Sequence, residues 1–189
     1  MTNPAVQPQP EDLDWTYVII DGCADCGFDP TTLDRADLPV RIRAAAGAFR
    51  LRLGALDART RPAPAVWSPT EYACHVRDTC TIMNTRARLM LDEENPVFAN
   101  WDQDASAIEQ RYWEQEPAAV ADQLEAAADA AATTFATVAA DAWDRPGRRA
   151  RENPPSPRNA DGGDSSFTVG TLGTYFLHDL EHHVWDVTK

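Results

Sequence analysis

Residues 168–186 read Thr168-Val-Gly-Thr-Leu-Gly-Thr-Tyr-Phe-Leu-His178-Asp-Leu-Glu-His182-His183-Val-Trp-Asp186. Thr168 is a favourable N-cap, and the following apolar residues recur at helical spacing, so the stretch predicts a long helix. Residues four apart on a helix lie about 40° apart in azimuth, so His178 and His182 can point at one ion. His183 lies about 100° further round, and we expect it to leave that face.

The remaining histidine, His75, follows the clearest helix start in the sequence. Ser68 is the expected N-cap, Pro69 takes the first helical position, and Glu71 completes a capping box. The helix is expected to run to about Leu91, with His75 on its core-facing side.

We therefore predict that His75, His178 and His182 meet around one divalent metal. Three neutral imidazoles leave coordination positions open, as catalytic zinc sites do, and they equally suit nickel, iron or copper. Taken alone, His178 and His182 could be an incidental histidine pair, and His75 could be an ordinary core histidine. The metal site depends on the two motifs together.

Four long helices are predicted, over residues 37–56, 68–91, 117–142 and 168–186. Because strand signals are few, they indicate an all-α fold, an antiparallel four-helix bundle.

The sequence also divides into a bundle and an extension. We expect the bundle to occupy residues 31–189 and an N-terminal extension to occupy residues 1–30. Residues 97–115 read as a loop with a short helix. Residues 144–166, rich in Pro and Gly, read as a long exposed loop before the last helix.

The extension carries a Cys-x-x-Cys turn. Cys23 and Cys26, followed by Gly27, resemble half of a zinc knuckle, and a full site needs two more ligands. Cys74 and Cys80 could supply them if the extension folds back onto the second helix. A redox dithiol and a plain thiol pair in a tight turn are the alternatives.

Composition limits the classes of partner and the cellular location that we expect. The 189 residues carry a net charge of −13 and a pI near 4.6, so the surface repels nucleic acid and anionic membranes. No apolar run approaches the roughly 20 residues of a membrane span, and the N-terminus is not a secretory signal, so we expect a cytoplasmic location. Abundant Arg and Ala suggest a GC-rich bacterial genome.

The motif Trp67-Ser-Pro-Thr-Glu-Tyr-Ala-Cys-His75, followed about a hundred residues later by His178-x-x-x-His182, resembles the DinB/YfiT-like superfamily. This superfamily includes the N-terminal domain of mycothiol-dependent maleylpyruvate isomerase. The resemblance covers residues 35–187. It implies a four-helix bundle with a metal, zinc or nickel, held by His75, His178 and His182, and an activity among metal-dependent thiol S-transferases.

The expected function is therefore a metal-dependent S-transferase or isomerase. The metal would hold a low-molecular-weight thiol as thiolate, which would attack a small electrophile. The bacterial signature favours mycothiol as co-substrate. No catalytic residue is predicted beyond the metal site, and the sequence leaves a homodimer open.

Two other functions stay open. One is a non-enzymatic bundle that binds a metal or small ligand. The other is a metal-dependent hydrolase, in which His178-Asp179-x-x-His182 takes the place of the HExxH pattern, with Asp instead of Glu. Asp179 or Glu181 could orient a ligand imidazole, but the simpler interpretation is that both are solvated charges on the outer face of the helix. The same two interpretations apply to Asp78.

Overall fold

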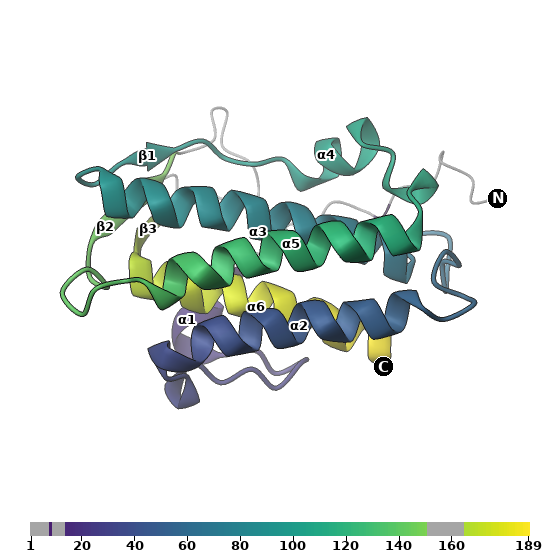
Figure 1. Ribbon diagram of the computed structural model, residues 1–189, viewed down its shortest axis with the longest axis horizontal. Coiled ribbons are helices and arrows are strands. Elements are labelled where there is room, and N and C mark those ends of the chain that lie inside the picture. Colours follow the sequence, from purple (N-terminus) through teal and green to yellow (C-terminus); the bar gives the residue numbers. More distant parts are fainter. Residues whose placement is uncertain (1–7, 9–13, 151–164) are drawn as a thin grey trace.

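The computed structural model of the protein describes residues 8, 14–150 and 165–189. Four long helices form the body of the molecule (Figure 1): α2 (Leu38–Leu53), α3 (Pro69–Asp92), α5 (Pro117–Ala136) and α6 (Val169–Thr188). The predicted all-α four-helix bundle is confirmed.

The starts of the two histidine-bearing helices are capped by side chains, as predicted. At α3, the backbone N–H of Ser68 donates to Glu71 Oε2 at 2.9 Å, and the Ser68 hydroxyl oxygen accepts from the Glu71 backbone N–H at 3.3 Å. At α6, Thr168 Oγ1 accepts from the Thr171 backbone N–H at 3.1 Å. Each cap satisfies a backbone donor that a helix start leaves unpaired, and so fixes where the helix begins.

The other two long helices differ slightly from expectation. Asp37 stands at the N-cap position of α2 but makes no side-chain capping bond. The helix α5 ends at Ala136, earlier than the predicted end near residue 142.

The helices are arranged so that α5 packs against α2 and α3, and α6 packs against the same two helices. The helices α2 and α6 run in one direction, and α3 and α5 run in the other (Figure 1). Because α3 and α6 are antiparallel neighbours, the first half of α3 lies against the second half of α6. His75 and the α6 histidines therefore lie at the same end of the bundle.

The bundle core is apolar and aromatic. Phe49, Phe135 and Phe176, from three different helices, are almost completely buried. The rings of Phe135 and Phe176 stack with centroids 6.1 Å apart. Within the described part of the chain, no helix is both long and apolar enough to cross a membrane.

A small sheet closes the other end of the bundle. The strand β2 (Pro146–Arg149) pairs in parallel with β1 (Val97–Phe98) and antiparallel with β3 (Ser165–Thr168). The ends of the predicted loop 144–166 are thus strands, too short to show an alternating pattern. Residues 151–164 of that loop lie outside the described residues. The short helix expected within residues 97–115 is α4 (Gln103–Glu109).

Short elements make up the described part of the N-terminal extension (residues 1–30), which we call the N-terminal segment. They are η1 (Trp15–Tyr17), α1 (Val18–Asp21) and η2 (Pro30–Thr32), and further single turns are η3 (Arg35–Asp37) and η4 (Tyr112–Glu114). The helix α1 packs against α6, and Val18 and Phe28 are buried. The segment therefore folds back onto the last helix and not onto the second long helix.

Candidate functional site

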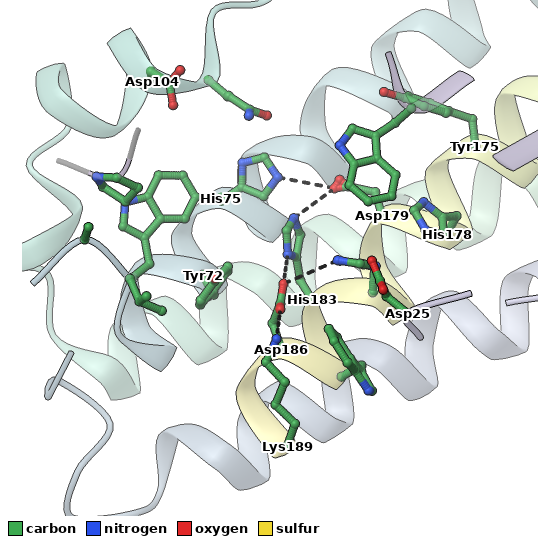
Figure 2. Close-up of a pocket in the computed structure, with 18 residues that line it drawn as sticks. Asp25, Tyr72, His75, Asp104, Tyr175, His178, Asp179, His183, Asp186 and Lys189 are labelled. Atoms are coloured by element: carbon green, nitrogen blue, oxygen red, sulfur yellow. Dashed lines mark hydrogen bonds and ion pairs between the residues drawn. The ribbon is translucent and has the colours of Figure 1, made fainter. Parts of the chain in front are cut away.

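A cavity of about 470 Å³ opens between the first half of α3, the second half of α6 and the N-terminal segment (Figure 2). Its wall combines aromatic rings with carboxylates and imidazoles. The lining residues that bear on function are Trp15, Asp25, Trp67, Tyr72, His75, Asp104, Tyr175, His178, Asp179, His182, His183, Trp185, Asp186 and Lys189.

One group of potential metal ligands joins α3 to α6. His75, Asp179 and His183 each offer one ligand atom, and these atoms all lie within 4.8 Å of one another. Asp179 Oδ1 lies 3.2 Å from His75 Nε2 and 3.7 Å from His183 Nε2. The two imidazole rings are perpendicular, with centroids 4.9 Å apart. Both rings therefore present Nε2 to the same carboxylate.

Neighbouring side chains fix the orientation of the two imidazoles of this group. The His75 ring is only 2% exposed and lies between Trp67 and Trp101, whose ring centroids are 5.7 and 5.5 Å away. His183 Nδ1 lies 2.9 Å from Asp186 Oδ2. Burial raises the pKa of Asp186, but the hydrogen bonds from His183 and Lys189 and the neighbouring histidines together lower it more, so the pKa lies below its ordinary value. An ionised carboxylate only accepts, so His183 Nδ1 donates this hydrogen bond and the ring is held with Nε2 toward Asp179.

These donors fit a divalent metal. Burial raises the pKa of Asp179, but His75, His183 and His178 together lower it more, to about 2, so the carboxyl is ionised at neutral pH. His183 Nε2 faces a carboxylate oxygen of Asp179 at 3.7 Å, and a divalent cation bound there would contact both groups. Two imidazoles and one carboxylate form the donor set of catalytic zinc sites and of non-haem iron sites.

A second group of potential ligands joins α6 to the N-terminal segment. Cys23, Cys26, His178 and His182 also place their ligand atoms within 4.8 Å of one another. Cys23 Sγ lies 3.6 Å from His182 Nδ1. His178 is 3% exposed, and its Nε2 has no hydrogen-bond partner among the described residues. Burial lowers the pKa of His178 to about 4, so this imidazole is neutral at neutral pH.

The structure therefore divides the three histidines predicted as one ligand set. His75 lies with Asp179 and His183, whereas His178 and His182 lie with the two cysteines. The reason is the rotation of α6 about its axis, since a shift of one residue changes direction by about 100°. As expected, His183 leaves the face shared by His178 and His182, and it faces α3.

Asp179 and His183 were not among the predicted ligands, although a signal for them was present. They are four residues apart, like His178 and His182, so the sequence contains two overlapping pairs. Spacing alone does not say which pair faces His75. Asp179 contacts His75 directly and is not a solvated charge.

Four other candidate residues lie apart from both groups. Glu181 accepts two hydrogen bonds from Arg41, at 2.8 and 2.7 Å, and Asp78 pairs with Arg77 at 2.8 Å. These carboxylates serve in ion pairs. Cys74 and Cys80 are fully buried in α3 and belong to neither ligand group. Burial raises the pKa of the Cys74 thiol to about 12, as expected of an inert core thiol.

Comparisons with known proteins identify similar structures and the family of the chain. YfiT from Bacillus subtilis, described as a probable metal-dependent hydrolase with an unusual four-helix bundle topology, is similar in structure with a TM-score of 0.66. It shares 14% sequence identity, and the match covers 82% of this chain and 85% of that chain. No curated protein matches the chain. The family model described as the DinB superfamily matches residues 41–187, well over half of the sequence, and the chain belongs to the DinB superfamily.

Proposed function

We propose that the protein is a metal-dependent enzyme that acts on a small organic molecule in the cavity between α3 and α6. The observation that carries this proposal is the convergence of His75, Asp179 and His183 in the wall of that cavity. Three protein donors leave coordination positions open, as in catalytic metal sites.

The residues around the site have distinct tasks. His75, Asp179 and His183 would hold the ion, and Asp186 fixes the tautomer and orientation of His183. When bound, a divalent metal supplies Lewis acidity, which lowers the pKa of a thiol or of water and polarises a carbonyl group. Tyr72, whose ring lies 5.2 Å from that of His183, and the tryptophans of the wall offer apolar surface to a substrate.

The charge of the cavity limits the substrate. Asp25, Asp104, Asp179 and Asp186 line it, and the Nζ of Lys189, which also lines it, pairs with Asp186 at 2.9 Å. Anionic substrates such as phosphate esters or dicarboxylates would meet repulsion there. An uncharged sugar-linked thiol such as mycothiol is compatible with this lining. We therefore propose transfer of a thiol to a small electrophile, or isomerisation through such an adduct, as the reaction.

A second candidate is hydrolysis. It is supported by the structural similarity to YfiT, which is described as a probable metal-dependent hydrolase. The two reactions differ in the nucleophile, which is a thiol in one and water in the other. The donor set suits both.

Turnover by metal-loaded protein tests the proposal. Zinc-, nickel- and iron-loaded protein would be assayed with mycothiol and a panel of small electrophiles, and separately with neutral esters and amides. Turnover that requires the thiol and disappears in His75→Ala supports the transferase. Turnover without thiol that disappears in the same variant supports the hydrolase.

A matched control separates the site from general damage to α6. Glu181→Gln changes a carboxylate on the same helix that lies outside both ligand groups, and it should keep full activity. If the protein bound substrates or products but turned over none of them with any of the metals, the proposal would be contradicted. The protein would then be a non-enzymatic binding protein. The cytoplasmic location and the homodimer stay predictions.

A further inference from the structure

We propose that Cys23, Cys26, His178 and His182 bind a structural zinc ion that fastens the N-terminal segment to α6. This site is separate from the proposed catalytic one and has different ligands. Its four ligand atoms lie within 4.8 Å of one another. Two thiolates and two imidazoles in a closed set of four are the donors of structural zinc sites.

The cysteine half of the site is a tight, specific turn. The Cys23 backbone N–H donates to the Phe28 carbonyl at 2.9 Å, and the Gly27 N–H donates to the Cys23 carbonyl at 2.9 Å. Gly22 and Gly27 have φ values of 72° and 76°, which other residues rarely adopt. A Cβ atom at Gly22 would lie 2.5 Å from the Phe28 carbonyl oxygen. The turn brings both sulfur atoms to the side that faces α6.

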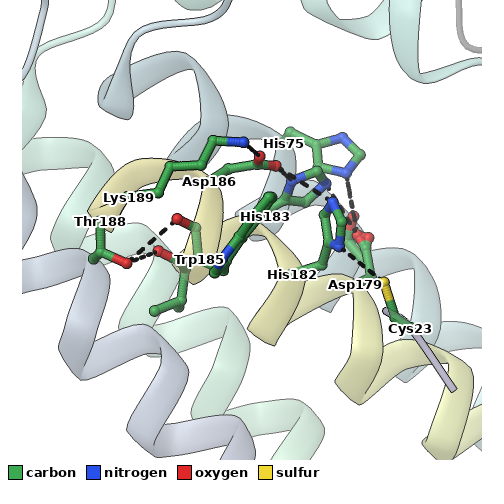
Figure 3. Close-up of polar contacts among 11 residues, drawn as sticks. Cys23, His75, Asp179, His182, His183, Trp185, Asp186, Thr188 and Lys189 are labelled. Carbon is green, nitrogen blue, oxygen red and sulfur yellow. Dashed lines mark hydrogen bonds and ion pairs between the residues drawn. The ribbon is translucent and has the colours of Figure 1, made fainter. Parts of the chain in front are cut away.

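The histidine half comes from one turn of α6. His182 Nδ1 and Cys23 Sγ are 3.6 Å apart (Figure 3). Ligands at about 2.3 Å and about 2.0–2.1 Å from a tetrahedral zinc lie about 3.6 Å from each other, so the observed separation is that of two ligands of one ion. His178 Nε2 is buried without a partner among the described residues, and a bound cation would satisfy it.

The surroundings suit a buried ion. The Trp15 ring lies 5.4 Å from the ring of His178 and 5.0 Å from that of His182, and Phe28 lies edge-on to His178 at 5.4 Å. These rings cover the part of the site at which Cys23 and His178 are buried, whereas Cys26 and His182 are partly exposed. Two thiolates and two neutral imidazoles balance the charge of Zn²⁺, so the closed site carries no net charge into this apolar setting.

The site also explains how α6 carries two ligand pairs. His178 and His182 face the N-terminal segment, and Asp179 and His183 face α3, about 100° away around the helix. Asp186 lies 3.7 Å from His182 and 2.9 Å from His183, so one carboxylate stands behind a ligand of each site. The zinc would hold Trp15 and Asp25, which line the cavity, in place against α6.

Cobalt substitution of the untagged wild-type protein tests the site directly. Thiolate ligands give cobalt(II) a near-ultraviolet charge-transfer band, and tetrahedral coordination gives strong visible bands. The proposed catalytic group contains no thiolate, so the charge-transfer band reports only the cysteine site. We expect both features, and we expect them to persist in Asp179→Asn. Absence of the charge-transfer band in the wild type would overturn the proposal, whether or not the enzyme is active.

Zinc analysis gives an independent result. Cys23→Ala/Cys26→Ala should lose one zinc equivalent per chain relative to the wild type, whereas Cys74→Ala/Cys80→Ala, which removes two thiols outside the site, should lose none. In native wild-type protein, a chelator should make two further thiols reactive, a result that does not depend on the folding of any variant. Equal zinc contents in the wild type and the Cys23/Cys26 variant, or recovery of a disulfide from protein kept anaerobic, would refute the zinc site.

Discussion

Asp186 is the residue whose substitution should weaken both metal sites at once. Its Oδ2 accepts from His183 Nδ1 at 2.9 Å and lies 3.7 Å from His182 Nε2. A carboxylate in this position makes the opposite ring nitrogen more basic and holds the ring in orientation. Loss of such a partner costs about 10- to 100-fold in metal affinity, which equals about 1.4–2.7 kcal/mol.

The size of the effect should depend on the substitution. In Asp186→Asn the amide oxygen still accepts a hydrogen bond but carries no charge, so we expect about a tenfold loss at the His75 site. In Asp186→Ala both effects are lost, and we expect a change nearer to 100-fold. The effect at the cysteine site should be smaller, because the separation from His182 is longer than that from His183.

Competition with a chromophoric chelator measures both zinc dissociation constants. Glu181→Gln is the matched control, because it removes a carboxylate from the same helix that pairs with Arg41 and lies outside both ligand groups. If Asp186→Ala bound zinc as tightly as the wild type, or if Glu181→Gln weakened binding equally, the assigned role of Asp186 would be refuted.

Three other perturbations follow from the structure. Glu71→Gln should lower the free energy of unfolding by about 1–3 kcal/mol, because it removes the charge of the buried carboxylate that pairs with Arg61. The absence of any measurable change in urea denaturation would contradict this. Gly22→Ala should lower stability by about 1–3 kcal/mol through backbone strain and should reduce bound zinc. The control Gly47→Ala, in α2 with no atom within 4 Å of the added Cβ, should instead be stabilising by about 0.5–1 kcal/mol. Removal of zinc with a chelator should lower the midpoint of thermal unfolding, and an unchanged midpoint would indicate that neither site is filled in the native protein.

The bundle was predictable from the sequence because its signals are local. The helix caps are formed by Ser68, Glu71 and Thr168, and their hydrogen bonds need only a few neighbouring residues. The apolar spacing of α2 and α5 is equally local. The small sheet was not predicted, because its strands of two to four residues form by pairing between distant segments.

The grouping of the ligands was not predictable from spacing. The pairs His178/His182 and Asp179/His183 both satisfy the four-residue rule, and the choice between them depends on how α6 is rotated in the bundle. That rotation results from packing on both sides of the helix. The location of the N-terminal segment supplies the missing information, because Cys23 and Cys26 lie against one face of α6 and leave the other to His75.

Anomalous diffraction at the zinc absorption edge, from crystals of metal-loaded protein, is the most direct test of the central claim that His75, Asp179 and His183 hold a metal. The account predicts two peaks for each chain. One should lie among His75, Asp179 and His183, and the other among the cysteines and the remaining two histidines. A single peak shared by His75, His178 and His182, or the absence of any peak within bonding distance of His75, would contradict the account.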